Sequence, residues 1–258
     1  MGINSKVRDY RVGSCKSKGL NMQDILTKIA DLNWQIIADA MNEKGYAIVS
    51  DILSDVHCQE LIDIYDRPDG YRKTVIMERY RYGLGEYKYF SYPLPDIIQT
   101  LRENIYSKLV PIANLWMKVL NIETRFPENL DKLHAQCRVH NQCKPTPLIL
   151  KYGVGGFNTL HQDLYGDIYF PLQTIFFLTE PDEDFTGGEF VLMQQTPRAQ
   201  SKAIVLRPKK GEMLIATTNF RPVKGSKGYY RANMKHGISE VHSGQRYTMG
   251  IIFHDAVS

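Results

Sequence analysis

Residues 148–178 read LILKYGVGGFNTLHQDLYGDIYFPLQTIFFL, and this stretch decides the fold class. Its two ends, Leu148–Tyr152 and Pro171–Leu178, are short runs of apolar residues with the length of buried strands. Between them lie a glycine-rich turn at 155–156 and the polar triplet His161-Gln162-Asp163. Strand-like runs that follow one another so closely, with a glycine turn between them, predict a β-sandwich or a jelly-roll barrel.

The same pattern of short strand-like runs and glycine turns continues to the end of the chain. Four more strand-like runs follow, at Glu189–Met193, Ala203–Leu206, Glu212–Ala216 and Tyr247–Phe253, with glycine turns between them. We therefore expect a jelly-roll core over residues 145–256. The chain has neither a GxGxxG nor a P-loop pattern, so the sequence gives no support for a nucleotide-binding fold.

The first half of the chain has helical periodicity instead. Apolar residues recur at helical spacing over 21–41, and a short strand at 46–49 precedes a helix that begins at Ser54 or Asp55. Further helices are predicted over 94–120 and about 127–139, before the breaker Pro145-Thr146-Pro147. We expect helices within 21–140 to support the barrel, which gives an α+β, mainly β, fold with one domain over 21–258.

Composition limits the class of protein. The 258 residues are 43% hydrophobic, which is enough for one sizeable core. The sequence has no run of about 18 apolar residues, the length that a membrane helix needs. The opening residues lack the apolar region of a secretory signal, so we expect a soluble, cytoplasmic protein with no membrane partner. The four cysteines form no CxxC pair, and we interpret them as free thiols.

The charge is concentrated at the N-terminus. The net charge is +4, and residues 1–20 carry five basic residues and one acidic residue, which also gives +4. The remaining residues hold 27 basic and 27 acidic side chains, so composition alone gives no signal for nucleic-acid binding. We expect residues 1–20 to be a disordered basic tail.

Two histidines and an aspartate are the candidate metal ligands. His161 and Asp163 are two residues apart on an extended segment, so their side chains project to the same side. His236, in the last β segment at the start of a strand-like run, can supply the third ligand of a two-histidine, one-carboxylate site. A single His-x-Asp arises often by chance, and a lone histidine is more often structural.

Arg246 begins an apolar strand, where a guanidinium is rarely buried without an anion. Thr248 lies two residues on and faces the same side of the strand, so both side chains can bind one carboxylate. The alternative is an internal salt bridge between Arg246 and an Asp or Glu of the chain.

The order of these residues resembles that of the Fe(II)/2-oxoglutarate dioxygenases, whose fold is a double-stranded β-helix. More closely, residues 87–95, 161–166, 185–190 and 250–255 are similar to the prokaryotic-type 2OG-Fe(II) oxygenase family, labelled as acting oxidatively on damaged, alkylated DNA. The resemblance runs from about Tyr71 to Asp255, and no departure occurs at the ligands.

The resemblance implies a site with Fe(II), 2-oxoglutarate and O2. It implies that His161, Asp163 and His236 hold the iron, that Arg246 and Thr248 bind 2-oxoglutarate, and that succinate and CO2 form as a substrate C–H bond is oxidised. Tyr152 is a weaker candidate for the co-substrate site, since an aromatic on a barrel strand is more often part of the core. His242 and His254 are alternative metal ligands, although surface or supporting positions suit them better.

The substrate stays open at this stage. Residues 71–92 mix basic and aromatic side chains, as do surfaces that bind nucleic acid, and a second basic cluster from Arg221 to Lys235 precedes His236 and could rim the site opening. Such runs are more often solvated faces. The alternatives are oxidative demethylation of alkylated nucleic acid, hydroxylation of a protein side chain such as proline, and oxidation of a small molecule. A non-catalytic jelly roll that binds a metal or ligand is the alternative of another class.

Overall fold

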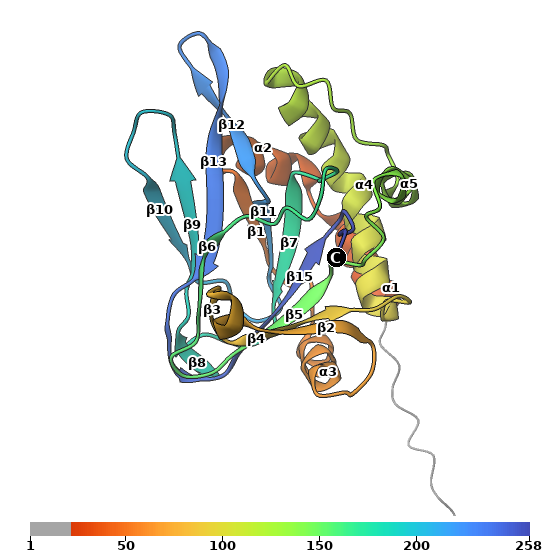
Figure 1. Cartoon of the computed structure of the whole chain (residues 1–258), viewed down its shortest axis with the longest axis vertical. Coiled ribbons are helices and arrows are strands. Elements are labelled where there is room, and N and C mark those ends of the chain that lie inside the picture. The colour runs from red at the N-terminus through yellow and green to blue at the C-terminus, as the bar shows by residue number, and fades with distance from the viewer. Residues whose placement is uncertain (1–21) are drawn as a thin grey trace, which may run out of the picture.

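The structure is a computed structural model that describes residues 22–258, so the tail predicted over 1–20 lies outside the described residues. These residues contain five helices and a 3-10 turn (Figure 1). They are α1 (Met22–Asp31), α2 (Trp34–Lys44), α3 (Asp55–Tyr65), η1 (Met77–Tyr80), α4 (Asp96–Val119) and α5 (Leu130–Val139).

Two antiparallel sheets form the jelly roll. The seven-stranded major sheet has the order β1 (Tyr46–Val49), β11 (Met213–Thr217), β7 (Leu172–Phe177), β15 (Arg246–Ile252), β5 (Leu148–Tyr152), β4 (Glu86–Phe90) and β2 (Tyr71–Ile76). The minor sheet has the order β10 (Lys202–Leu206), β9 (Phe190–Gln195), β13 (Gly228–Ile238), β6 (Phe157–His161) and β3 (Gly83–Leu84), and β12 (Phe220–Gly225) pairs with β13. A small pair joins β8 (Phe185–Gly187) to β14 (Val241–Gly244). Helices α1, α4 and α5 lie together on the side away from β9 and β10 (Figure 1).

Strand β15 lies between two apolar regions, and its side chains point alternately into one and the other. Tyr247, Met249 and Ile251 belong to the core shared with the helices. Arg246 and Thr248 point to the opposite face, because successive side chains of a strand alternate. That face looks into the barrel, where Phe177 and Phe190 belong to the core between the sheets. A fully buried strand therefore presents one polar pair to the barrel interior.

All six strands predicted over 148–253 are present. Leu148–Tyr152 agrees at both ends, and the other five have ends shifted by at most two residues. The single helix predicted over 21–41 is wrong. The chain breaks between α1 and α2, where the Asn33 side chain accepts a hydrogen bond from the backbone N–H of Ile36 and starts a new helix. His236 was expected at the start of a strand but lies near the end of the eleven-residue strand β13. The interval 21–140 also supplies strands β1 to β4, which extend both sheets.

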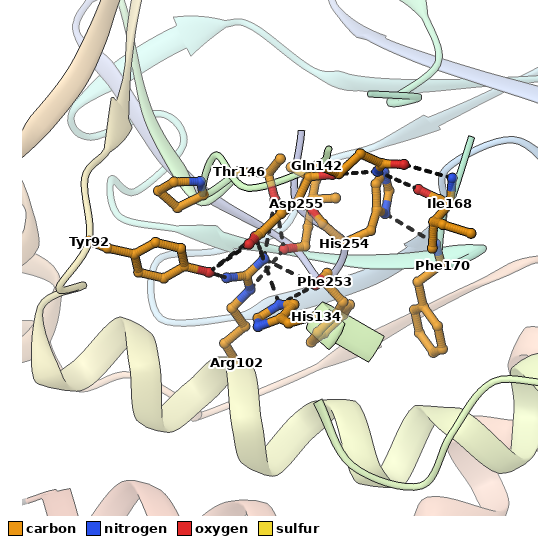
Figure 2. Close-up of polar contacts among 12 residues, drawn as sticks. Tyr92, Arg102, His134, Gln142, Thr146, Ile168, Phe170, Phe253, His254 and Asp255 are labelled. Carbon is orange, nitrogen blue, oxygen red and sulfur yellow. Dashed lines mark hydrogen bonds and ion pairs between the residues drawn. The ribbon is translucent and has the colours of Figure 1, made fainter. Parts of the chain in front are cut away.

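A buried ion pair ties the supporting helix α4 to the end of the barrel (Figure 2). Arg102 of α4 is fully buried and lies 2.8 Å from Asp255, which follows β15. The Tyr92 hydroxyl donates to the same carboxylate, and His134 of α5 lies beside it. These contacts attach α4 and α5 to the strand that carries Arg246. Within residues 22–258, no helix is both long and apolar enough to cross a membrane.

Candidate metal and co-substrate site

His161 and His236 are brought together by strand pairing. They are direct partners in the register of β6 and β13, and their ring centroids are 4.3 Å apart. The Nδ1–H of His161 donates to the Thr159 carbonyl oxygen at 2.8 Å, which leaves the Nε2 lone pair directed away from the backbone. The His236 ring stacks on Phe190, with 5.6 Å between the ring centroids and planes that differ by 8°. Both imidazoles therefore have a fixed orientation.

Asp163 completes a three-residue cluster. Its carboxylate oxygens lie 3.7 Å from Nε2 of His161 and 3.2 Å from Nε2 of His236. One ligand atom from each of the three residues lies within 4.8 Å of the others. Two imidazole nitrogens and one carboxylate oxygen at this spacing are the donor set that suits a non-haem Fe(II) ion with open positions. The residues present therefore fit the metal that the resemblance implies.

The electrostatics of the cluster keep Asp163 ionised. Burial by itself would raise the pKa of Asp163, but the neighbouring histidines, His236 foremost, hold it below its usual range. Burial lowers the pKa of His161, which favours the neutral imidazole that a metal requires. Asp163 is thus held as a carboxylate, and the neutral form of His161 is favoured, as metal binding by these two residues requires.

Two residues beside the cluster, Gln162 and Tyr165, fix the segment that carries His161 and Asp163. The Gln162 side-chain amide donates to the backbone carbonyls of Asn219 and Met234 at 2.8 and 3.0 Å, which attaches the loop to β13 and to the start of β12. The Tyr165 hydroxyl donates to Asp163 at 2.8 Å and fixes the carboxylate. Neither residue was singled out from sequence. The signal for Tyr165 was its spacing, two residues from Asp163 on the same extended segment.

A cavity runs from the cluster into the barrel. It is lined by the three cluster residues together with Tyr152 of β5, Thr248 of β15 and Asn158 of β6. Tyr152 is fully buried, and its hydroxyl accepts a hydrogen bond from Asn158 at 3.3 Å. The structure therefore places Tyr152 and Thr248 at the same cavity as the cluster. Asn158 was missed because an isolated asparagine on a strand carries no pattern.

Arg246 is a buried cation without an anion. The residue is 1% exposed, and its Nε and Nη1 atoms have no hydrogen-bond partner among residues 22–258. Aromatic rings surround it, with its guanidinium carbon 5.7 Å from the Tyr152 ring centroid and 5.6 Å from that of Phe177. Burial lowers the pKa of Arg246 to about 10. No carboxylate of the described residues forms an ion pair with it, so the internal salt bridge considered from sequence is wrong.

The Gly187-Gly188 turn makes room for this arginine. Gly188 has a positive φ of +60°, and a Cβ there would lie 2.9 Å from Cδ of Arg246. A larger residue would therefore be strained by its backbone conformation and would also press on the guanidinium stem. This turn, one of the glycine turns predicted between the strands, therefore also shapes the pocket of Arg246.

An open cleft lies in front of the cluster. Its volume is about 360 Å³, within the range of small-ligand pockets. Five tyrosines line it together with His161, Asp163 and Lys73, and they are Tyr80, Tyr82, Tyr87, Tyr89 and Tyr165. Four of these come from the aromatic segment 71–92, which the fold brings to the mouth of the barrel. Asp163 is the one acidic side chain among the described residues that line this cleft.

Three further candidates from sequence lie elsewhere. His242 is exposed on β14, and His254 is fully buried in a supporting position, with Nδ1 accepting from the Phe170 N–H. Neither joins the cluster of possible ligands. Arg221 does not rim the opening, because it is buried and donates to the Asn42 carbonyl of α2.

A protein-family model described as "Oxygenase, catalysing oxidative methylation of damaged DNA" matches residues 85–256. The chain belongs to this oxygenase family. Two curated proteins from strains of Mycobacterium tuberculosis, both named only as uncharacterised, are 45% identical over 167 residues, which is 65% of this chain and 72% of theirs. The resemblance drawn from sequence is thus confirmed.

Several solved structures have the same fold as this chain. A prolyl-4-hydroxylase from Pseudomonas putida has a TM-score of 0.53 at 10% identity, covering 86% of this chain and 98% of its own. A Trichoplax adhaerens prolyl hydroxylase, solved with a hypoxia-inducible-factor peptide, has a TM-score of 0.54 at 14% identity, covering 92% and 94%. A 2OG-Fe(II) oxygenase from Burkholderia pseudomallei has a TM-score of 0.51 at 12% identity, covering 88% and 93%.

Family and fold together make the oxygenase an oxidoreductase that uses Fe(II), 2-oxoglutarate and O2. Its core is the double-stranded β-helix expected from sequence. Membership of an oxygenase family excludes the alternative of a non-catalytic jelly roll.

Proposed function

We propose that His161, Asp163 and His236 hold the iron and that Arg246 and Thr248 bind the distal carboxylate of 2-oxoglutarate. The support for the first part is the convergence of three ligand atoms within 4.8 Å. The support for the second is the unpaired guanidinium of Arg246, since a buried cation without an anion is costly and a carboxylate ligand removes the cost.

In this assignment each side chain has one task. The two Nε2 atoms donate lone pairs, and Asp163 adds a negative charge that Tyr165 orients. Arg246 forms a bidentate pair with the carboxylate, and Thr248 adds a hydroxyl from the same face of β15. The bound metal supplies activation of O2, with 2-oxoglutarate oxidised to succinate and CO2. The surrounding aromatic residues exclude water from the guanidinium.

We further propose that the substrate is an alkylated base in a nucleic acid, from which the oxygenase removes a methyl group as formaldehyde. The observation that carries this is the cleft in front of the cluster, whose lining includes five tyrosine rings and Lys73. Flat bases stack on aromatic side chains with a free energy of about 1–3 kcal/mol per base. The description of the family, which names damaged DNA, agrees with this substrate.

Hydroxylation of a protein side chain is the second candidate, because two of the structural neighbours are prolyl hydroxylases. Their identity to this chain is low, and the likeness concerns the fold. A tyrosine-lined cleft can also accept a proline ring, so the two substrates must be compared directly.

The test measures succinate formed by the Fe(II)-loaded oxygenase with oligonucleotides that carry N-methylated bases, with the same oligonucleotides unmodified, and with proline-containing peptides. We expect stimulation and an equal amount of formaldehyde from the methylated oligonucleotides only. Stimulation by the peptides, without formaldehyde, would replace the nucleic-acid proposal with protein hydroxylation.

A further inference from the structure

Two hairpins of the minor sheet contain basic residues and no acidic residue. Hairpin β9–β10 spans Phe190–Leu206 and hairpin β12–β13 spans Phe220–Ile238, and together we call them the basic arm. The basic arm holds seven Lys and Arg residues and no Asp or Glu. The other residues from 22 onward therefore carry 20 basic and 27 acidic side chains. Residues 22–258 have no net charge, but the basic arm is positive and the rest is negative. Composition alone did not indicate this separation of charge.

The charges of the basic arm are available to a partner. None of the seven basic residues has a carboxylate within ion-pair distance among the described residues. Arg221 is buried, and the other six are Arg198, Lys202, Lys224, Lys227, Arg231 and Lys235. Five of the six are exposed, and Lys235 is half-buried. By contrast, Arg207 and Lys210, just outside the arm, are paired with Asp182 and Asp55. The arm therefore lacks the countercharges found beside it.

The basic arm is joined directly to the metal cluster. Figure 1 shows both hairpins extending from one end of the barrel, and β13 runs without a break from the arm to His236. At a rise of about 3.3 Å per residue, Arg231 lies roughly 17 Å along this strand from His236. Gln162, between two of the proposed ligands, donates to Asn219 at the start of β12. Because side chains alternate along a strand, Arg231 and Lys235 lie on the outer face of β13 and His236 faces the barrel, so a chain bound along the arm must pass the edge of the minor sheet to reach the cleft.

The surface of the basic arm matches a nucleic acid in chemistry. Tyr229 and Tyr230 are exposed next to Lys227 and Arg231, so rings and cations alternate at the tip of β12–β13. A groove between the two hairpin tips is lined by Arg198 and Arg231 with amide side chains, and no carboxylate is among its lining residues. Cations with interleaved aromatic rings bind phosphates and stack bases.

The depth of the cluster favours a single strand. Asp163 and His236 are buried, and a substrate reaches the cluster through the cleft. A base in a duplex reaches an atom at such a depth only if it is flipped out, at a cost in unpairing and unstacking that an unpaired base of a single strand largely avoids.

We propose that the basic arm binds the phosphate backbone of single-stranded DNA and delivers an unpaired base to the cleft. This rests on the proposed nucleic-acid substrate, and it adds the surface that holds the strand. Each Lys or Arg that contacts a phosphate releases counterions, so binding must weaken as salt rises.

The experiment measures the binding of a fluorescein-labelled oligothymidylate to the full chain by anisotropy over a series of NaCl concentrations. The arm variant is Lys224→Gln, Lys227→Gln and Arg231→Gln. The matched control is Lys108→Gln, Lys132→Gln and Arg138→Gln, which removes two lysines and one arginine from exposed positions of α4 and α5. Residues 1–20 are the same in both, so the basic N-terminal segment does not distinguish them.

We expect the arm variant to bind at least about tenfold more weakly, with the slope of log affinity against log salt reduced by about 2, as about 0.7 per lost single-strand contact gives. The control should match the wild type. Changing Lys224 and Lys227 to Arg should preserve binding, which separates loss of charge from loss of the fold, and melting temperatures of all variants check folding.

Equal binding by the arm variant and the wild type, or equal weakening in the control, would overturn the proposal. Tighter binding of oligouridylate would overturn the assignment to DNA, and arm-dependent binding to phosphatidylserine vesicles without binding to DNA would make the arm a membrane surface. If arm-dependent DNA binding occurs but methylated oligonucleotides do not stimulate succinate formation in the wild type, the basic arm stands and the proposed substrate fails.

Discussion

Arg246 and Arg102 are a natural pair for testing the co-substrate site. Both arginines are buried, with 1% and 0% of the residue exposed. Arg102 donates five hydrogen bonds, one of them to Asp255, whereas Nε and Nη1 of Arg246 have no partner. Arg102 is therefore neutralised by Asp255, whereas Arg246 has no anionic partner among the described residues. The same substitution should have opposite effects at the two positions.

The magnitude follows from burial. The pKa of Arg246 falls from 12.5 to about 10, and at 1.36 kcal/mol per pH unit this is a destabilisation of the charged form by about 3 kcal/mol. Replacing Arg246 with Met removes that cost, so the free energy of unfolding of the ligand-free protein should rise by about 1–3 kcal/mol. Arg102→Met leaves Asp255 buried and unpaired, so it should lower that free energy by about 3–5 kcal/mol.

Affinity for 2-oxoglutarate should change in the opposite way at Arg246. Loss of a buried charge partner costs about 3–5 kcal/mol, which corresponds to a dissociation constant raised about 150- to 5,000-fold. Arg246→Lys keeps the charge but loses the bidentate geometry, so its affinity should lie between those of the wild type and Arg246→Met. Urea unfolding without ligands gives the stabilities. Anaerobic titration of 2-oxoglutarate into Fe(II)-loaded protein, followed by the visible charge-transfer band, gives the affinities.

The reasoning would be refuted if Arg246→Met lowered stability as much as Arg102→Met and left the affinity for 2-oxoglutarate unchanged. Arg246 would then be a structural residue, and the co-substrate carboxylate would need another partner.

Three further predictions concern the cluster and its support. Asp163→Ala should abolish Fe(II)-dependent succinate formation and the charge-transfer band while the far-UV circular dichroism is retained, and a variant that still turned over would exclude Asp163 as a ligand. Asp255→Ala should lower the free energy of unfolding in urea by about 3–5 kcal/mol, whereas Asp167→Ala, at an exposed pair with His140, should change it by less than about 1 kcal/mol. Burial lowers the pKa of His134 to about 4 and of His254 to about 3, so the unfolded chain takes up protons first as the pH falls below about 6.5. The stability from each neutral histidine is therefore complete above that pH and declines towards pH 4 by up to about 1.4 kcal/mol per unit. His134→Gln should reduce this slope in urea unfolding by about one proton, and an unchanged slope would contradict it.

The sequence by itself determined the fold class and the residues of the cluster, because both depend on local patterns. Short apolar runs such as Leu148–Tyr152 predict strands by their length and composition, and helical spacing over 94–120 predicts α4. His161, Asp163, His236 and Arg246 were found because their order along the chain resembles a family pattern.

Only the tertiary structure decided how these residues meet and what surrounds them. His161 and His236 are 75 positions apart, and only the register of β6 with β13 makes them neighbours. Whether Arg246 has a partner depends on every chain segment that packs around it, so an internal salt bridge could not be rejected from sequence. The polarity of the basic arm depends on the pairing of β13 with both β9 and β12, since composition counts charges and does not place them in space.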